Sequence, residues 1–180
     1  EITQDGFALV VCHELGHHLA GFPLKGDRWA ATEGQSDYFA TQSCAKRIWL
    51  NDPQTLSHDY RSEIPGFVAE ICDDQWTQAT EQAVCYRTQA ASVSLANLLS
   101  ALSSGPPPSF ESHDPTIVQR TYDAHPNAQC RLDTYSAGAI CQTPFEISNI
   151  PGRSHPSGQQ SIDAELVASE SSCMVAKGLD

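Results

Sequence analysis

Two histidines lie four residues apart in the segment His13-Glu14-Leu15-Gly16-His17, which has the pattern HExxH. Residues at this spacing share one face of a helix and lie about 6 Å apart along its axis, so both imidazoles can bind a single ion. Glu14 flanks such an ion without having to ligate it. The pattern predicts a metal centre at which Glu14 is the general base that takes a proton from water.

A second pair with the same spacing follows in the segment EGQSD, where Glu33 and Asp37 are the acidic residues. A catalytic zinc ion usually has three protein ligands and one open position. We predict that Glu33 completes a Zn²⁺ site with the two histidines. Asp37 would accept the outer N–H of a ligand imidazole and fix its tautomer. The alternative for this pair is a solvated helix face.

The elements that must position these residues are two neighbouring helices. The sequence predicts a helix over residues 4–20, which ends at Gly21 ahead of Pro23. A turn over 22–28 and a longer helix over 29–50 follow, so that the two helices pack antiparallel. The apolar face of the first helix has helical spacing and consists of Phe7, Val10, Val11, Leu15 and Leu19.

Strand signals are weak along the rest of the chain, so the expected fold class is mainly α. We predict a loop over 51–65, a short helix over 64–71, a long helix over 76–103 and a further helix from Pro126 to about Ala137. Residues 145–180 are rich in polar residues, Gly and Pro, and we expect an irregular tail there, tied by a disulfide. The 180 residues indicate a single domain. Because the sequence begins at Glu1, we expect a processed chain or part of a longer one.

HELGHH followed by ExxSD resembles the gluzincin zinc metallopeptidases. The short gap and helical context are most similar to the CAAX prenyl endopeptidase and HtpX-type family, especially its soluble bacterial relatives. The resemblance covers residues 7–45 and implies a zincin-like core. It also implies that His13, His17 and Glu33 are zinc ligands, that Glu14 is the base and that Asp37 supports His13. The metzincin pattern HExxHxxGxxH is absent, because Pro stands at position 23.

A later His-Pro segment with an arginine is also typical of that family, and His125-Pro126 with Arg131 looks similar. The resemblance implies that His125 aims a donor at the oxyanion of a tetrahedral intermediate. Arg131 would hold an acidic helix residue or the substrate carbonyl. A cap for His125 and a surface ion pair for Arg131 are the alternatives. Tyr135 is close enough in sequence either to assist the transition state or to pack.

Seven cysteines without a CxxC motif favour disulfides in an oxidising compartment, so we expect a secreted or periplasmic protein. We expect the disulfides Cys72–Cys85 and Cys130–Cys141, because each pair is close in sequence. Cys12, which precedes the motif, would be a buried thiol. Cys173 would tie the tail.

The formal net charge of −12 makes nucleic acid an unlikely partner, because the phosphate backbone repels an acidic chain. No apolar run approaches the roughly 20 residues of a membrane span. We therefore expect a peptide or protein substrate, no nucleic acid and no membrane span, and the sequence leaves the oligomeric state open.

Together these features predict a zinc-dependent endopeptidase. Two other functions stay open: a disulfide-stabilised binding module with a structural zinc ion, which would show four protein ligands, and an inactive pseudo-peptidase that regulates a partner.

Overall fold

The computed structural model describes residues 1–26, 29–118 and 123–142, of which 66% are helical. Within these ranges, β structure is limited to one antiparallel bridge between Leu24 and Ala31. The helices are α1 (Gln4–Leu19), α2 (Glu33–Phe39), the π-helix η1 (Ala40–Ala45), α3 (Lys46–Trp49), α4 (Pro53–Ser57), the 3₁₀-helix η2 (Tyr60–Glu63), α5 (Gly66–Gln75), α6 (Ala79–Ser103) and α7 (Ala128–Ile140). The prediction of a mainly α fold is confirmed.

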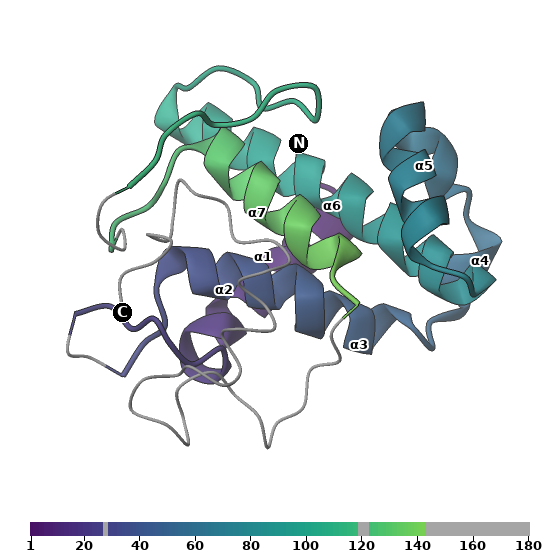
Figure 1. The fold of residues 1–180 in the computed structure, drawn as a ribbon, viewed down its shortest axis with the longest axis horizontal. Coiled ribbons are helices and arrows are strands. Elements are labelled where there is room, and N and C mark those ends of the chain that lie inside the picture. The colour runs from purple at the N-terminus through teal and green to yellow at the C-terminus, as the bar shows by residue number, and fades with distance from the viewer. Residues whose placement is uncertain (27–28, 119–122, 143–180) are drawn as a thin grey trace.

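The long helix α6 is the central helix, against which most of the others pack (Figure 1). Helix α7 runs along one side of α6, and α1 packs against both α6 and α2. Helices α4 and α5 lie together near the N-terminal part of α6, away from the start of α7. Helix α2 contacts both α1 and α7, and these three helices carry all the candidate site residues except His125.

The second predicted helix begins four residues later than expected, at Glu33 instead of position 29. The reason is a compact turn: Gly21 adopts a positive φ of 77°, and Leu24 pairs with Ala31. Thr32 then caps α2 by accepting a hydrogen bond from the backbone N–H of Gln35. From there α2, η1 and α3 run on without a break to Trp49, close to the predicted end at 50.

The other helix boundaries differ by a few residues from those predicted. The predicted loop over 51–65 contains the short helices α4 and η2, and α5 ends at Gln75, beyond the predicted 71. Helix α7 begins at Ala128, because the side chain of Asn127 caps it by accepting from the backbone N–H of Cys130. The predicted tail over 145–180 lies outside the described residues.

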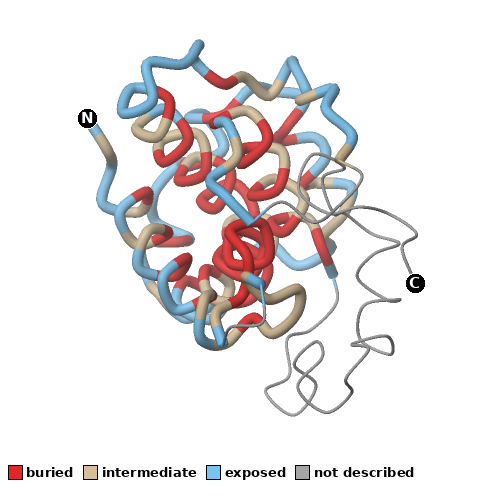
Figure 2. Tube along the Cα trace, turned by 90° about the vertical axis from the view of Figure 1, so that its left-hand side faces the viewer, coloured by how far each residue is buried: buried red, intermediate tan, exposed pale blue. Residues whose placement is uncertain are grey.

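The expected apolar face of α1 is wrong as a core face, because Phe7, Val11 and Leu15 are exposed. The buried side of α1 instead carries Gly6, Leu9, Cys12, His13 and Gly16. Figure 2 shows burial along the chain, with buried segments in the interior and exposed segments outside. One core cluster joins α1 to η1, α3, α6 and α7 and consists of Leu9, Ala45, Trp49, Val84, Ala91, Leu95 and Tyr135.

A buried arginine anchors the start of α1 on α6. Both Nε and Nη2 of Arg87 donate to the carboxylate of Asp5 at 2.8 Å. Its Nη1 donates to Asp52 at 2.7 Å, just before α4. A bidentate pair of this kind fixes orientation as well as position, so it holds the HExxH helix against the rest of the fold.

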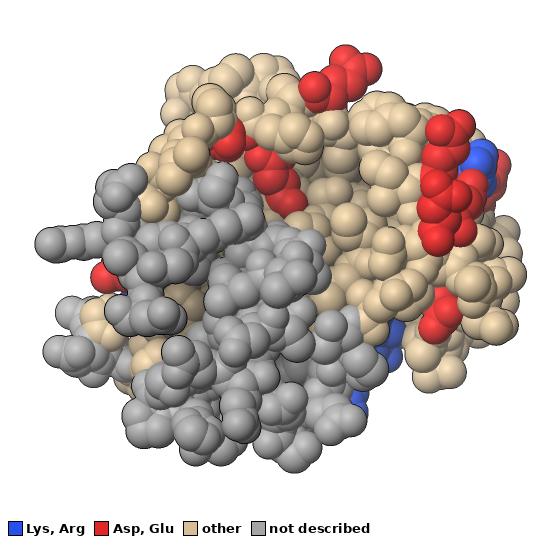
Figure 3. Space-filling view, viewed as in Figure 1, with Lys and Arg blue, Asp and Glu red and all other residues tan. Residues whose placement is uncertain are grey.

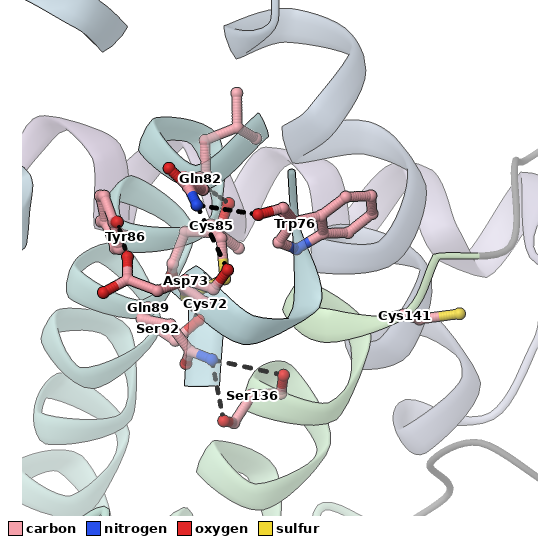
Figure 4. Close-up of a disulfide and its surroundings, with 12 residues drawn as sticks. Cys72, Asp73, Trp76, Gln82, Cys85, Tyr86, Gln89, Ser92, Ser136 and Cys141 are labelled. Carbon is pink, nitrogen blue, oxygen red and sulfur yellow. Dashed lines mark hydrogen bonds between the residues drawn. A yellow bond between two sulfur atoms is a disulfide. The ribbon is translucent and has the colours of Figure 1, made fainter. Parts of the chain in front are cut away.

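The predicted disulfide Cys72–Cys85 is present and links α5 to α6 (Figure 4). The predicted pair Cys130–Cys141 is wrong, because Cys141 is a buried free thiol and Cys130 is disulfide-bonded. Cys12 is not a thiol either: it bonds to Cys44 and ties α1 to η1. Proximity in sequence identified only the short-range bridge, since α1 and η1 approach each other through tertiary packing. Cys173 lies outside the described residues.

No helix among the described residues is long and apolar enough to cross a membrane. On the face shown in Figure 3, acidic side chains are more prominent than basic ones over the described residues, in keeping with the net charge of −12. The two disulfides that join described residues, Cys12–Cys44 and Cys72–Cys85, are compatible with an oxidising compartment.

Candidate metal centre

The two histidines of α1 lie one helical turn apart and face α2. Their ring centroids are 4.7 Å apart, with the planes at 81°. Thr3 caps the helix by accepting from the backbone N–H of Gly6. Because the rings meet edge to face, both can turn an Nε2 atom toward the same point.

Gly16 allows α2 to approach this face of α1. A Cβ atom at Gly16 would lie 2.8 Å from Cα of Ser36 and 2.9 Å from its carbonyl oxygen. Both are backbone atoms, which cannot move aside as a flexible side chain can. The glycine inside the HExxH motif therefore sets the distance between the helix that carries the histidines and the helix that carries Glu33.

Glu33 lies between the two imidazoles. Its Oε2 is 3.2 Å from Nε2 of His13, and its Oε1 is 3.7 Å from Nε2 of His17. One ligand atom from each of the three residues lies within 4.8 Å of the other two, so His13, His17 and Glu33 can hold a metal ion. The structure brings together the three residues that the sequence proposed as ligands.

The carboxylate of Glu33 fits a cation for a further reason. The side chain is only 1% exposed, and its Oε2 is buried without a hydrogen-bond partner. A buried, ionised oxygen without a donor is costly. Two imidazole nitrogens and one carboxylate oxygen are a donor set typical of zinc, and a divalent ion among them would satisfy this oxygen.

The Nδ1 atoms of both imidazoles, which point away from Glu33, are hydrogen-bonded to other groups. Nδ1 of His13 donates to Oδ1 of Asp37 at 2.7 Å. Nδ1 of His17 donates to the carbonyl oxygen of Ala31 at 2.8 Å and lies 2.9 Å from Oγ of Ser36. A carbonyl oxygen only accepts, so the proton of His17 is on Nδ1. This leaves Nε2 with the lone pair that a metal ligand needs.

Asp37 is the centre of a buried network that α7 completes. Arg131 donates to it through Nε at 2.8 Å and through Nη2 at 2.6 Å, and Oη of Tyr135 donates at 2.7 Å. Burial opposes ionisation of Asp37, but the charges and hydrogen bonds of Arg131 and His13 outweigh it and lower its pKa. Asp37 is thus an anion that orients His13, and Arg131 holds an acidic helix residue, one of its two expected roles.

The imidazole of His13 is protonated on both nitrogens, and so positively charged, at neutral pH in the metal-free protein. Burial lowers its pKa, but the hydrogen bond and charge of Asp37 and the neighbouring carboxylate of Glu33 prevail and raise the pKa from 6.5 to about 9. A ligand imidazole must be neutral, so a metal ion has to displace this proton. Below pH 9 the affinity should therefore rise with pH, by about tenfold per unit for one proton released.

We expect zinc binding near pH 7 to release one proton from His13 per chain. Calorimetric titration in two buffers of different ionisation enthalpy measures that number. His113→Gln, at an exposed position on the loop before α7, should leave it unchanged. An affinity that does not vary between pH 6.5 and 8.5 would contradict the assignment of His13 as a ligand.

His125 lies beside this group, and Glu14 directly follows the ligand candidate His13 on α1. Glu14 is exposed on α1 and has no hydrogen bond or ion pair to any described residue. Nε2 of His125 lies 3.5 Å from Oε2 of Glu33, and its side chain is 72% exposed. His125 is three residues ahead of α7, so it is near the helix start as expected, but outside the helix.

A hollow of about 780 Å³ extends from this side of the site. His125 and Arg131 line it, and the C-terminal part of α6 contributes Leu99 and Leu102. Because His125 and Arg131 also contact Glu33 and Asp37, the hollow begins next to the metal-binding group. It offers room for a ligand beside His125 and Arg131.

Sequence reasoning missed several of the residues that surround the site. Lys25 pairs with Glu33, and Ser36 and the Ala31 carbonyl contact His17. Ser36 belongs to the ExxSD segment, but no sequence pattern indicated that Lys25 would pair with Glu33. Tyr135 is fully buried and binds Asp37, so it supports the network and does not reach a substrate.

Comparison with known proteins gives no further guide to function. No protein family, no curated protein and no solved structure matches this chain. The function is therefore inferred from the geometry of the site.

Proposed function

We propose that this protein is a secreted zinc-dependent endopeptidase that cleaves peptide bonds with Glu14 as the general base. The observation that carries the proposal is the convergence of His13, His17 and Glu33, with Oε2 of Glu33 buried and without a hydrogen bond. Exposed Glu14 directly follows His13 on α1. Zinc bound there would acidify a coordinated water molecule and polarise the scissile carbonyl.

The residues of the chain supply the remaining steps. Glu14, free of other partners among the described residues, takes a proton from the attacking water and returns it to the leaving amine. His125 is exposed at the rim of the hollow and donates a hydrogen bond to the oxyanion of the substrate. Asp37, Arg131 and Tyr135 keep His13 in place and take no part in the proton transfer.

A second function, a binding module with a structural zinc ion, is favoured by one distance. Nε2 of His125 lies 3.5 Å from Oε2 of Glu33, so it is near enough to become a fourth protein ligand. Four protein ligands would close the site to water and substrate. The two functions thus differ in whether His125 binds the metal or the substrate.

A peptide-library digest tests the proposed activity. We expect the purified protein to cleave peptides, to lose all cleavage when a chelator removes its metal, and to regain it with one equivalent of Zn²⁺ per chain. Mg²⁺ should not restore it, because magnesium prefers oxygen ligands. Failure of zinc-loaded protein to cleave any peptide would favour the structural site or a pseudo-peptidase.

A further inference from the structure

The two oxygens of the Glu33 carboxylate have different surroundings. Oε1 forms an ion pair with Nζ of Lys25 at 2.5 Å. Oε2 has no hydrogen bond and lies near Nε2 of His13 at 3.2 Å and Nε2 of His125 at 3.5 Å. Oε1 is therefore paired with a cation of the protein itself and lies 3.7 Å from Nε2 of His17, whereas Oε2 faces His13 and His125.

The turn between α1 and α2 places Lys25 at this point. The backbone N–H of Lys25 donates to the carbonyl of Ala30 at 2.8 Å, and the neighbouring Leu24 pairs with Ala31. The N–H of Ala31 donates to the carbonyl of His17 at 2.9 Å, and its carbonyl accepts from the His17 ring. The same turn thus positions His17, one of the histidine ligands, and the ammonium group of Lys25 that pairs with Glu33.

Lys25 does not occupy the position of the metal in this arrangement. Its ammonium group makes no hydrogen bond to either imidazole among the described residues, although both rings lie next to Glu33. Its side chain is 31% exposed, so part of it reaches solvent. The ion pair and the metal ligand position use different oxygens of one carboxylate.

We propose that Lys25 is a positioning residue that restricts Glu33 to bind the metal ion through Oε2 alone. The ion pair holds Oε1 away from the metal, so the carboxylate supplies one ligand atom instead of two. With two imidazoles this makes three protein donors and leaves a position open for water or substrate. The inference rests on the metal site of the proposed function, but not on peptide hydrolysis.

The test replaces the ammonium group and measures the coordination of the metal. In Lys25→Met and Lys25→Gln, Oε1 loses its partner and is free to join Oε2 on the metal. We expect zinc-edge X-ray absorption to show about one additional oxygen around the ion. We also expect the Co²⁺-substituted variants to lose visible absorption intensity as the site changes from four to five ligands.

Two further variants separate this effect from a general loss of charge or fold. Lys25→Arg keeps a donor cation on Oε1 and should retain the coordination of the unmodified protein. Arg47→Met removes an exposed charge on α3 and should change nothing. Circular dichroism verifies that each variant is folded before metal is added.

The proposal is overturned if both Lys25→Met and Lys25→Gln bind zinc with unchanged coordination. It is also overturned if they bind zinc more tightly with the same number of ligands, because Lys25 would then compete with the metal. Neither result depends on cleavage of a peptide. An inactive protein that shows the coordination change would refute the proposed function and leave the role of Lys25 intact.

Discussion

Replacement of Glu14 with Gln should reduce kcat/KM for any cleaved peptide by about 10²–10⁴-fold and leave zinc bound. The amide of Gln has nearly the same shape as the carboxylate but cannot accept the proton of the attacking water. Glu14 is exposed and makes no hydrogen bond or ion pair with a described residue, so the substitution should not disturb the fold. Steady-state kinetics and metal analysis of one preparation measure both expectations.

The matched control is Glu70→Gln, which neutralises an exposed glutamate on α5, away from the metal-binding group. It should match the unmodified protein in turnover and in zinc content. Full activity of Glu14→Gln would refute Glu14 as the base. Loss of zinc from Glu14→Gln would show that Glu14 is a ligand.

Replacement of Asp37 with Asn should destabilise the metal-free protein by about 3–5 kcal/mol, because it leaves the buried charge of Arg131 without its partner. Arg131 donates twice to Asp37 and is itself buried. The same change removes the anion that orients His13, so the affinity for zinc should fall by about 10–100-fold. Chemical denaturation and a zinc-chelator competition measure these two losses.

Asp73→Asn is the control for this prediction. Asp73 pairs with Arg61, but both side chains are substantially exposed, and such pairs contribute about 0–1 kcal/mol. The control should therefore cost little stability and no zinc affinity. Equal losses in Asp37→Asn and Asp73→Asn would mean that the buried network does not organise the site.

The sequence predicted the ligand group because its residues lie on two helices that are adjacent in the chain. His13 and His17 share one face of α1 through helical spacing, and the short turn before Glu33 leaves α2 few ways to pack. Arg131 was suggested only by resemblance, and its partner Asp37 lies 94 residues away. A contact of that range depends on how α7 packs, which local patterns do not encode.

The predicted core face of α1 was wrong because the buried face of this helix carries site residues instead of the predicted large apolar ones. Phe7, Val11 and Leu15 have the spacing of a core face, yet α1 buries His13 and Gly16 instead. The burial of His13 is stabilised by Asp37, and the burial of Gly16 by close contact with Ser36. Hydrophobic periodicity alone cannot detect a face that is buried through polar pairs and backbone contact.

Anomalous diffraction at the zinc edge, on crystals of the zinc-loaded protein, tests the central claim most directly. The expected result is one ion per chain, about 2.0–2.2 Å from Nε2 of His13, Nε2 of His17 and Oε2 of Glu33, with no bond to His125 or Glu14. An ion that is absent from this position, or that binds His125 as a fourth protein ligand, would contradict the assignment of a catalytic centre.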